Sequence, residues 1–167
     1  MIRILWQELT SGLHDSQQLA RVIIRLVAAM LMGGMVGVQR ESTRKPAGLR
    51  AHVLVSVAAA AFIIACSASG MSSDGLSRVI QGIVTGIGFI GAGTILKLSE
   101  EHRIKGLTTA ASVWMTAAIG VVVGLGSLGI ALMVTTLALV ILSLARLEHS
   151  IEDRGRRPGK QSDDHER

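Results

Sequence analysis

The fold is decided by residues 106–145, GLTTAASVWMTAAIGVVVGLGSLGIALMVTTLALVILSLA, which form forty consecutive positions without a charged side chain. Residues 51–73 and 79–96 are also free of Asp, Glu, Lys and Arg. A helix needs about 20 apolar residues to cross the hydrocarbon of a bilayer. Because lipid offers no hydrogen bonds to the backbone, each such run has to be helical. The sequence therefore predicts an all-α fold, a polytopic membrane helix bundle.

Five transmembrane helices are expected. The long uncharged run divides at residues 124–129, GLGSLG, a glycine-rich break that suits a tight turn. The expected spans are, in chain order, 22–38, 51–69, 79–96, 107–124 and 128–145. Together they form one transmembrane domain over residues 21–146.

The two terminal segments have a different character. In residues 1–20, apolar side chains recur at helical spacing: Ile2, Leu5, Trp6, Leu9 and Leu13. This pattern indicates a short amphipathic helix in the membrane interface, with a frayed tail as the alternative. Charged residues interrupt the apolar run that a cleavable signal peptide would need. Residues 147–167 are polar and too few to form a core, so we expect a disordered cytoplasmic tail.

The distribution of basic residues predicts the orientation. Of seventeen Lys and Arg residues, thirteen lie in loops 39–50 and 97–106 and in the C-terminal tail, which share one side of a five-span chain. The other side has four. Because cationic residues accumulate on cytoplasmic loops, we expect the N-terminus outside and the C-terminus in the cytoplasm. The net charge of +5 is explained in this way, and nucleic acid is not expected as a partner.

Three separated motifs carry a family resemblance. They are VGVQRESTRKPAGLRAH at residues 36–52, GIVTGIGFIGAGTILK at 82–97 and GLTTAASVWMTAAIGVVVGLG at 106–126. In order and spacing they resemble the signature of the MgtC/SapB family of bacterial inner-membrane proteins, over approximately residues 30–130. Longer members carry a cytoplasmic domain after the last span. This chain resembles a short form that has the hydrophobic domain only.

The resemblance implies a role in magnesium limitation and stress adaptation. It points to a non-catalytic regulatory or interaction module that acts on a larger membrane complex, with ATP synthase as a candidate partner. Membrane lipids and a second copy of the chain are further expected partners. The alternative is a transporter or channel for Mg²⁺ or another cation, formed by an oligomer.

The candidate interaction motif follows the first span. Its residues are Arg40, Glu41, Lys45, Pro46, Gly48, Arg50 and His52. Proline prevents a continuous helix here, and glycine permits the turn before the second span. A mixed-charge cluster at the membrane edge is typical of a protein-docking or anion site. The alternative is a topology anchor with internal ion pairing.

Glycines mark the predicted helix contacts. The candidate packing positions are Gly82, Gly86, Gly88, Gly91, Gly93, Gly120 and Gly124. Small residues let helix backbones approach closely in lipid. The third span has small residues on two of its faces, so we place this helix at the centre of the bundle, between its neighbours. The alternative is a broken helix whose carbonyls face an ion. Residues 86–91 also match G-x-G-x-x-G, but without the preceding strand and following acid of a dinucleotide site.

Catalysis is not expected. None of the five spans contains Asp or Glu, the groups that a proton relay or a path for a dehydrated cation normally needs. The sequence has no nucleophile–base pair and no His/Cys cluster at metal-ligand spacing, so we predict no enzyme and no cofactor, and a metal site is left undefined. Asp74 is interpreted as a helix N-cap, with Arg78 as its partner in an external ion pair.

The orientation can be tested by cysteine labelling in intact cells. Cysteines introduced at Ser42 and Ser162 should be shielded from a membrane-impermeant thiol reagent, whereas one at Ser72 should react. Labelling of Ser42→Cys from outside would overturn the five-span topology.

Overall fold

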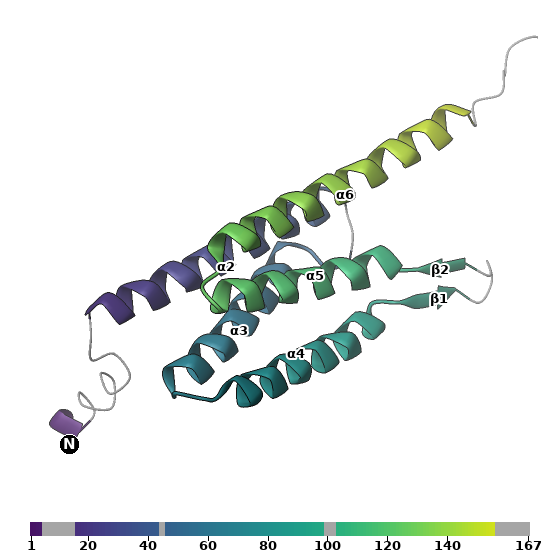
Figure 1. Cartoon of the computed structure of the whole chain (residues 1–167). Coiled ribbons are helices and arrows are strands. Elements are labelled where there is room, and N and C mark those ends of the chain that lie inside the picture. Colours follow the sequence, from purple (N-terminus) through teal and green to yellow (C-terminus); the bar gives the residue numbers. More distant parts are fainter. Residues whose placement is uncertain (5–15, 44–45, 99–102, 156–167) are drawn as a thin grey trace, which may run out of the picture.

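The computed structural model shows a bundle of long helices with a short hairpin at one end (Figure 1). It describes residues 1–4, 16–43, 46–98 and 103–155, with the backbone alone for 96–98, 103–105 and 145–155. Most of the predicted interfacial segment 1–20, Lys45 and residues 156–167 of the predicted tail lie outside this description. The elements are α2 (Ser16–Ser42), α3 (Leu49–Ala68), α4 (Ser73–Gly93), β1 (Leu96–Leu98), β2 (Arg103–Lys105), α5 (Leu107–Gly124) and α6 (Leu128–Gly155).

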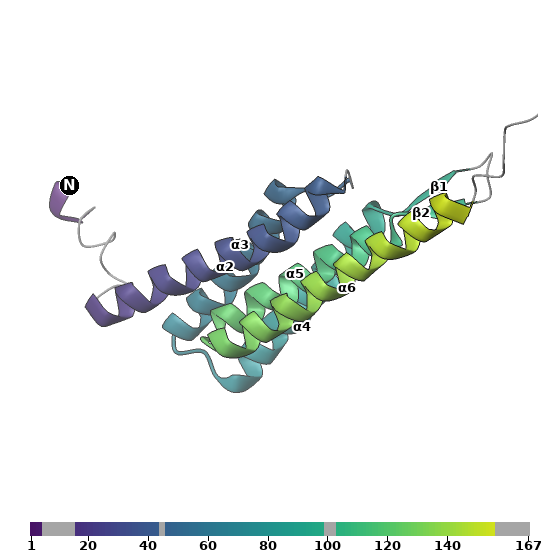
Figure 2. The same cartoon turned by 90° about the horizontal axis from the view of Figure 1, so that it is seen from above.

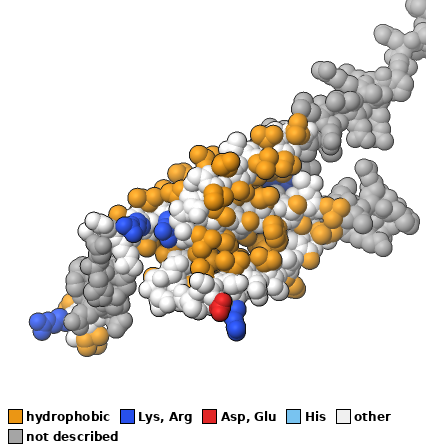
Figure 3. Space-filling model, viewed as in Figure 1, with side chains coloured by type: hydrophobic (Ala, Val, Ile, Leu, Met, Phe, Trp, Pro, Cys, Tyr) orange, Lys and Arg blue, Asp and Glu red, His pale blue; other side chains and the backbone are white. Residues whose placement is uncertain are grey.

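The predicted all-α membrane bundle is confirmed. By length and composition, α2, α3, α4 and α5 can each cross a membrane. The described apolar part of α6, Leu128–Leu144, is somewhat shorter. On the face seen in Figure 3, apolar side chains cover the body of the bundle and charged ones are sparse. Such a surface suits contact with lipid rather than water.

Two helix ends differ from the prediction. The α4 helix begins at Ser73, because Ser72 is its N-cap and accepts the Gly75 N–H at 3.3 Å. Asp74 therefore lies in the first turn, and the N-cap role predicted for it is wrong. At the other end of the chain, α6 continues to Gly155, through residues for which a disordered tail was predicted. No proline interrupts this polar stretch before Gly155, so the helix does not end where the charges begin.

The loop between α4 and α5 contains an unpredicted antiparallel hairpin. Leu96 pairs with Lys105 and Leu98 with Arg103. The hairpin and the end of α6 project at the same end of the molecule in both views (Figures 1 and 2). Gly106 closes it with a φ of 102°. Since an added Cβ there would overlap the carbonyl oxygen of Thr94, only glycine fits.

The helix α2 packs directly on the backbone of α3. A methyl group added at Gly33 would lie 2.6 Å from Ser56 Cβ, and one at Gly37 would lie 2.7 Å from Leu49 Cα. Both distances are too short for real atoms. Two glycines one turn apart therefore set the separation of α2 and α3.

The helix α5 approaches α3 in the same way, and it also contacts α2. A Cβ added at Gly120 would overlap the Ser56 carbonyl oxygen, and one at Gly124 would lie 2.7 Å from Ile63 Cβ. Gly120 and Gly124, predicted as packing positions, thus lie at the contact between α3 and α5. The most buried of the four long apolar helices is α5, which contacts α2, α3, α4 and α6.

The helix α4 lies at the edge, so its predicted central position is wrong. An added Cβ would meet no neighbouring atom within 4 Å at Gly82, Gly86, Gly88 or Gly93, and at Gly91 it would make ordinary contact with Ala110. Only 11% of the apolar window of α4 is buried, against 50% for α5. The helix is continuous, which rules out the broken-helix alternative. Four of its five candidate packing glycines therefore have no close neighbour within the described chain.

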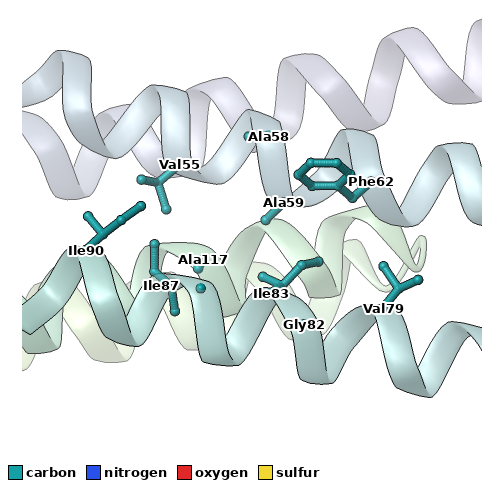
Figure 4. A pocket seen from close by; sticks show the side chains of 11 residues that line it. Val55, Ala58, Ala59, Phe62, Val79, Gly82, Ile83, Ile87, Ile90 and Ala117 are labelled. Carbon is teal, nitrogen blue, oxygen red and sulfur yellow. The ribbon is translucent and has the colours of Figure 1, made fainter.

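An open apolar cleft separates α4 from α3. Its volume is about 430 Å³. Val55 and Phe62 of α3 face Ile83 and Ile87 of α4 across it, and Gly82 leaves the α4 side without a side chain (Figure 4). The α4 helix is held instead by a small apolar cluster of Ile87 with residues of α5 and the α2–α3 loop.

One arginine ties α2 to the turn between α5 and α6. Arg25 Nη1 donates a hydrogen bond to the Gly124 carbonyl oxygen at 2.9 Å. A cation at the carboxyl end of a helix satisfies a free carbonyl and interacts favourably with the negative end of the helix dipole. Gly126, with a φ of 86°, lies directly against the guanidinium, because an added Cβ would be 2.5 Å from Arg25 Nη2.

Glycine substitutions at the centre of the bundle should lower its stability more than glycine substitutions at its edge. We expect Gly120→Ala to lower stability by about 1–3 kcal/mol, because the added methyl overlaps the α3 backbone. Gly86→Ala should be close to neutral, because the same methyl meets nothing within 4 Å. Thermal unfolding of both variants in one detergent checks this expectation. Equal losses would place α4 in the packed interior after all.

Candidate functional site

The predicted interaction motif divides into residues that face inward and residues that face outward. Arg40 is 4% exposed and His52 is fully buried. Glu41, Pro46 and Arg50 are exposed. Lys45 lies outside the described residues. The motif is therefore not one continuous docking surface.

Arg40 extends from α2 into the contact with α5. Its Nη2 donates a hydrogen bond to Thr109 Oγ1 at 2.5 Å. Its Nε is buried and has no hydrogen-bond partner among the described residues. No carboxylate of the described part of the chain lies within 4.0 Å of the guanidinium. The charge is thus held by a hydroxyl rather than by an ion pair.

His52 connects α3 to α5 beside this arginine. Its Nδ1 lies 2.9 Å from the Gly48 carbonyl oxygen, which can only accept, so Nδ1 carries a proton. Its Nε2 lies 3.3 Å from Ser112 Oγ. In the neutral ring, Nε2 accepts the Ser112 hydroxyl proton. That hydroxyl also lies 2.8 Å from the Thr109 carbonyl oxygen, so its single proton has two competing acceptors.

These side chains form a buried polar layer that joins the three central helices. We define this layer by four residues: Arg40, His52, Thr109 and Ser112. Arg40 belongs to α2, His52 to α3, and the two hydroxyl residues to α5. All four are buried. Because each buried polar group costs free energy when unpaired, the bonds within the layer fix the relative positions of these helices.

Glu41 stabilises the loop between α2 and α3. Its Oε2 accepts the Leu49 N–H at 2.9 Å, and Leu49 is the first residue of α3. A carboxylate at the amino end of a helix satisfies a free N–H and complements the helix dipole. Gly48 leaves room for it, because an added Cβ would lie 3.1 Å from Glu41 Oε2. Glu41 therefore acts as a cap from a neighbouring helix.

Of the predicted docking residues, Arg40 and His52 face the interior, so their side chains are not accessible on the surface of the described bundle. Arg50, in the first turn of α3, is the charged motif residue that remains exposed without a hydrogen bond or ion pair to another described residue. A signal for the buried pair was present in the sequence. Arg40 follows Gly33 and Val36 at helical spacing on the buried side of α2, and His52 precedes Ser56 by one turn on α3.

The predicted external ion pair is not formed. Asp74 and Arg78 are both exposed on α4 and line a shallow polar depression with Ser77 and Gln81. No ion pair within 4.0 Å joins them in the structure as described. An exposed pair of this kind contributes little to stability even when it forms.

The polar part of the otherwise apolar interior carries a cation and no acid among the described residues. The buried polar and charged side chains, among the described residues, are Arg40, His52, Ser56, Thr109, Ser112, Thr116 and Thr135. None of them is a carboxylate. Across the residues that the structure describes, no group of three or more His, Cys, Asp or Glu side chains could hold a metal ion.

Breaking the buried polar layer should cost more than breaking a similar bond at the surface. We expect Thr109→Val to lower stability by about 1–3 kcal/mol, because it removes the hydrogen-bond acceptor of a buried guanidinium. Thr136→Val is the matched control, since Thr136 is exposed and bonds only to the Leu132 carbonyl of its own helix. Thermal unfolding in detergent measures both. Equal shifts would show that Arg40 does not depend on Thr109.

Comparison with known proteins agrees with the motifs. A sequence model of the MgtC family matches residues 26–151. The chain is 42% identical to SrpB of Synechococcus elongatus over 130 residues, 71% of this chain and 71% of that protein. It is 43% identical to MgtC of Salmonella typhimurium over 124 residues, 74% of this chain and 52% of that protein.

A third relative is YhiD of Escherichia coli K12, which is named as a candidate magnesium transporter. It is 42% identical over 132 residues, 75% of this chain and 60% of that protein. The chain thus spans little more than half the length of MgtC and YhiD. No solved structure matches it. The family match covers α3, α4 and α5 entirely and most of α2 and α6, so the chain belongs to the MgtC family.

Proposed function

We propose that this chain is a non-catalytic regulatory module of the bacterial inner membrane, linked to magnesium homeostasis and stress adaptation. Membership of the MgtC family and the magnesium-related name of YhiD support the link to magnesium. The module acts on a larger membrane complex, for which ATP synthase is the candidate from the family resemblance. The orientation is the predicted one, with the C-terminus in the cytoplasm.

The observation that carries the proposal is the charge of the interior. The buried polar layer contains a guanidinium and, among the described buried residues, no carboxylate. Mg²⁺ binds oxygen ligands, chiefly carboxylates, and gives up its water reluctantly. A fixed positive charge in a medium of low dielectric constant repels a cation strongly. The centre of the bundle is therefore unsuited to conduct Mg²⁺.

The polar layer is also closed. His52 is fully buried and Arg40 nearly so, and the hydrogen bonds of the layer connect helices rather than line a channel. The cleft between α3 and α4 and the groove between α2 and α3 are both open at the surface of the bundle, and both are lined almost entirely by apolar residues. These features favour a packed interaction module over a carrier with an internal binding site.

The alternative function is cation transport by an oligomer. The name of YhiD favours it. In an oligomer, backbone carbonyls at an interface between copies could replace the missing carboxylates. The exposed glycines of α4 would permit such an interface, because the helix has no close neighbour along that side in the described chain.

Flux measurements distinguish the two functions. Purified protein in sealed liposomes should show no Mg²⁺ entry above empty vesicles, with and without an imposed membrane potential. In parallel, expression of the chain should restore growth under magnesium limitation to a strain that lacks it. Restoration of growth without flux is the result expected for a regulator.

Thr109→Val serves as the matched variant, because it disturbs the buried layer and leaves the exposed surface unchanged. A saturable Mg²⁺ flux, present in the wild type and altered by this variant, would contradict the regulatory proposal. Such a result would establish transport through the bundle.

A further inference from the structure

An open groove runs between α2 and α3 on the lipid-facing side of the bundle. Its volume is about 770 Å³. Apolar side chains form its walls, chiefly Leu31, Met35 and Val38 from α2 and Val53 from α3, and α6 contributes Leu139. Arg50 is the one charged residue among the residues that line it.

The groove has an apolar body and a cationic end. The α2 residues that line it, from 30 to 38, rise about 12 Å along the helix axis. Arg50 lies in the first turn of α3, next to the loop that ends the bundle. The groove therefore extends from the rim of the bundle, at Arg50, toward the middle of the membrane.

Arg50 differs from Arg25 and Arg40, whose guanidinium groups bind other parts of the bundle. Arg25 donates to the Gly124 carbonyl and Arg40 donates to Thr109. Arg50 has no hydrogen bond or ion pair with another described residue. A guanidinium presents paired N–H donors that match the oxygens of a phosphate.

We propose that this groove binds an anionic phospholipid, with an acyl chain along α2 and α3 and the headgroup phosphate on Arg50. The combination of an apolar furrow with one cation at the membrane rim is complementary to an amphiphile of negative charge. Basic sites between transmembrane helices are suited to anionic headgroups. This inference goes beyond the proposed regulatory function and does not depend on it.

The shape of the groove favours a lipid chain over a helix. At Gly33 and Gly37 the backbones of α2 and α3 are in contact, so the furrow between them is shallow. Its floor includes Gly34, where an added Cβ would make ordinary contact with Val53 and Leu49 at 3.6 and 3.7 Å. A flexible chain follows such a furrow, whereas a helix with side chains is about 10 Å across.

The experiment uses native mass spectrometry of the full chain released from nanodiscs of equal parts phosphatidylglycerol and phosphatidylcholine. The wild type should retain one phosphatidylglycerol in preference to phosphatidylcholine. Arg50→Gln should reduce that preference about tenfold, because it removes a charge-assisted contact. Gly34→Leu should prevent retention of either lipid at this site, because its side chain fills the groove.

Two matched variants control for charge and for bulk. Arg78→Gln removes an exposed charge from α4, and Gly82→Leu adds the same side chain in the α3–α4 cleft. Both should retain phosphatidylglycerol as the wild type does. Unfolding temperatures of all four variants show whether the bundle is intact. Since Arg50 is exposed, its variant decides the question even if Gly34→Leu is unstable.

The proposal is overturned if the wild type retains both lipids equally, or if Arg50→Gln leaves the preference unchanged. A second copy of the chain is the competing occupant. In that case Gly34→Leu would convert a dimer to a monomer and leave lipid retention as it was. Neither result alters the expected absence of Mg²⁺ flux, so the two proposals fail independently.

Discussion

The close approach of α2 and α5 to the backbone of α3 is the constraint on which the rest of the structure depends. Glycines on two helices meet α3 near the same residue, Ser56. In a membrane the helices gain little from leaving lipid, so van der Waals packing and hydrogen bonds between them must hold the bundle together. Both fall off steeply with distance. Without the glycines, the hydroxyls of α5 would not reach His52 and Arg40.

The buried polar layer depends on this close packing, and in turn it restricts how α2, α3 and α5 can be arranged. Arg40 and His52 reach Thr109 and Ser112 only while α2, α3 and α5 keep their present spacing. A shift of one helix would leave a guanidinium or an imidazole unpaired in a medium that solvates neither. The layer therefore selects one arrangement of three helices, while glycine contacts alone would permit several. It also gives the interior the positive charge on which the regulatory proposal rests.

The sequence predicted the membrane helices well, because an uncharged run of this length has few other stable states in a cell. It did not predict which helix is central. Small residues indicate that another helix can pack closely against a given helix, but they do not indicate which helix does so. The α4 glycines satisfy the same pattern as Gly120 and Gly124, yet only the α5 pair meets α3. The interior position of Arg40 was predictable from its helical spacing to Gly33, had the charge not suggested a surface.

Counting basic residues treats every arginine as an equivalent anchor, but the structure gives three of them different surroundings. Arg25 caps the end of α5, and Arg40 is enclosed by three helices. Both guanidinium groups donate hydrogen bonds to neighbouring helices, so replacing either arginine removes a contact that holds the bundle together. Arg50 is exposed at one end of an apolar groove and has no hydrogen bond or ion pair with another described residue. An anionic lipid headgroup can therefore bind Arg50 without breaking a contact that holds the described bundle together.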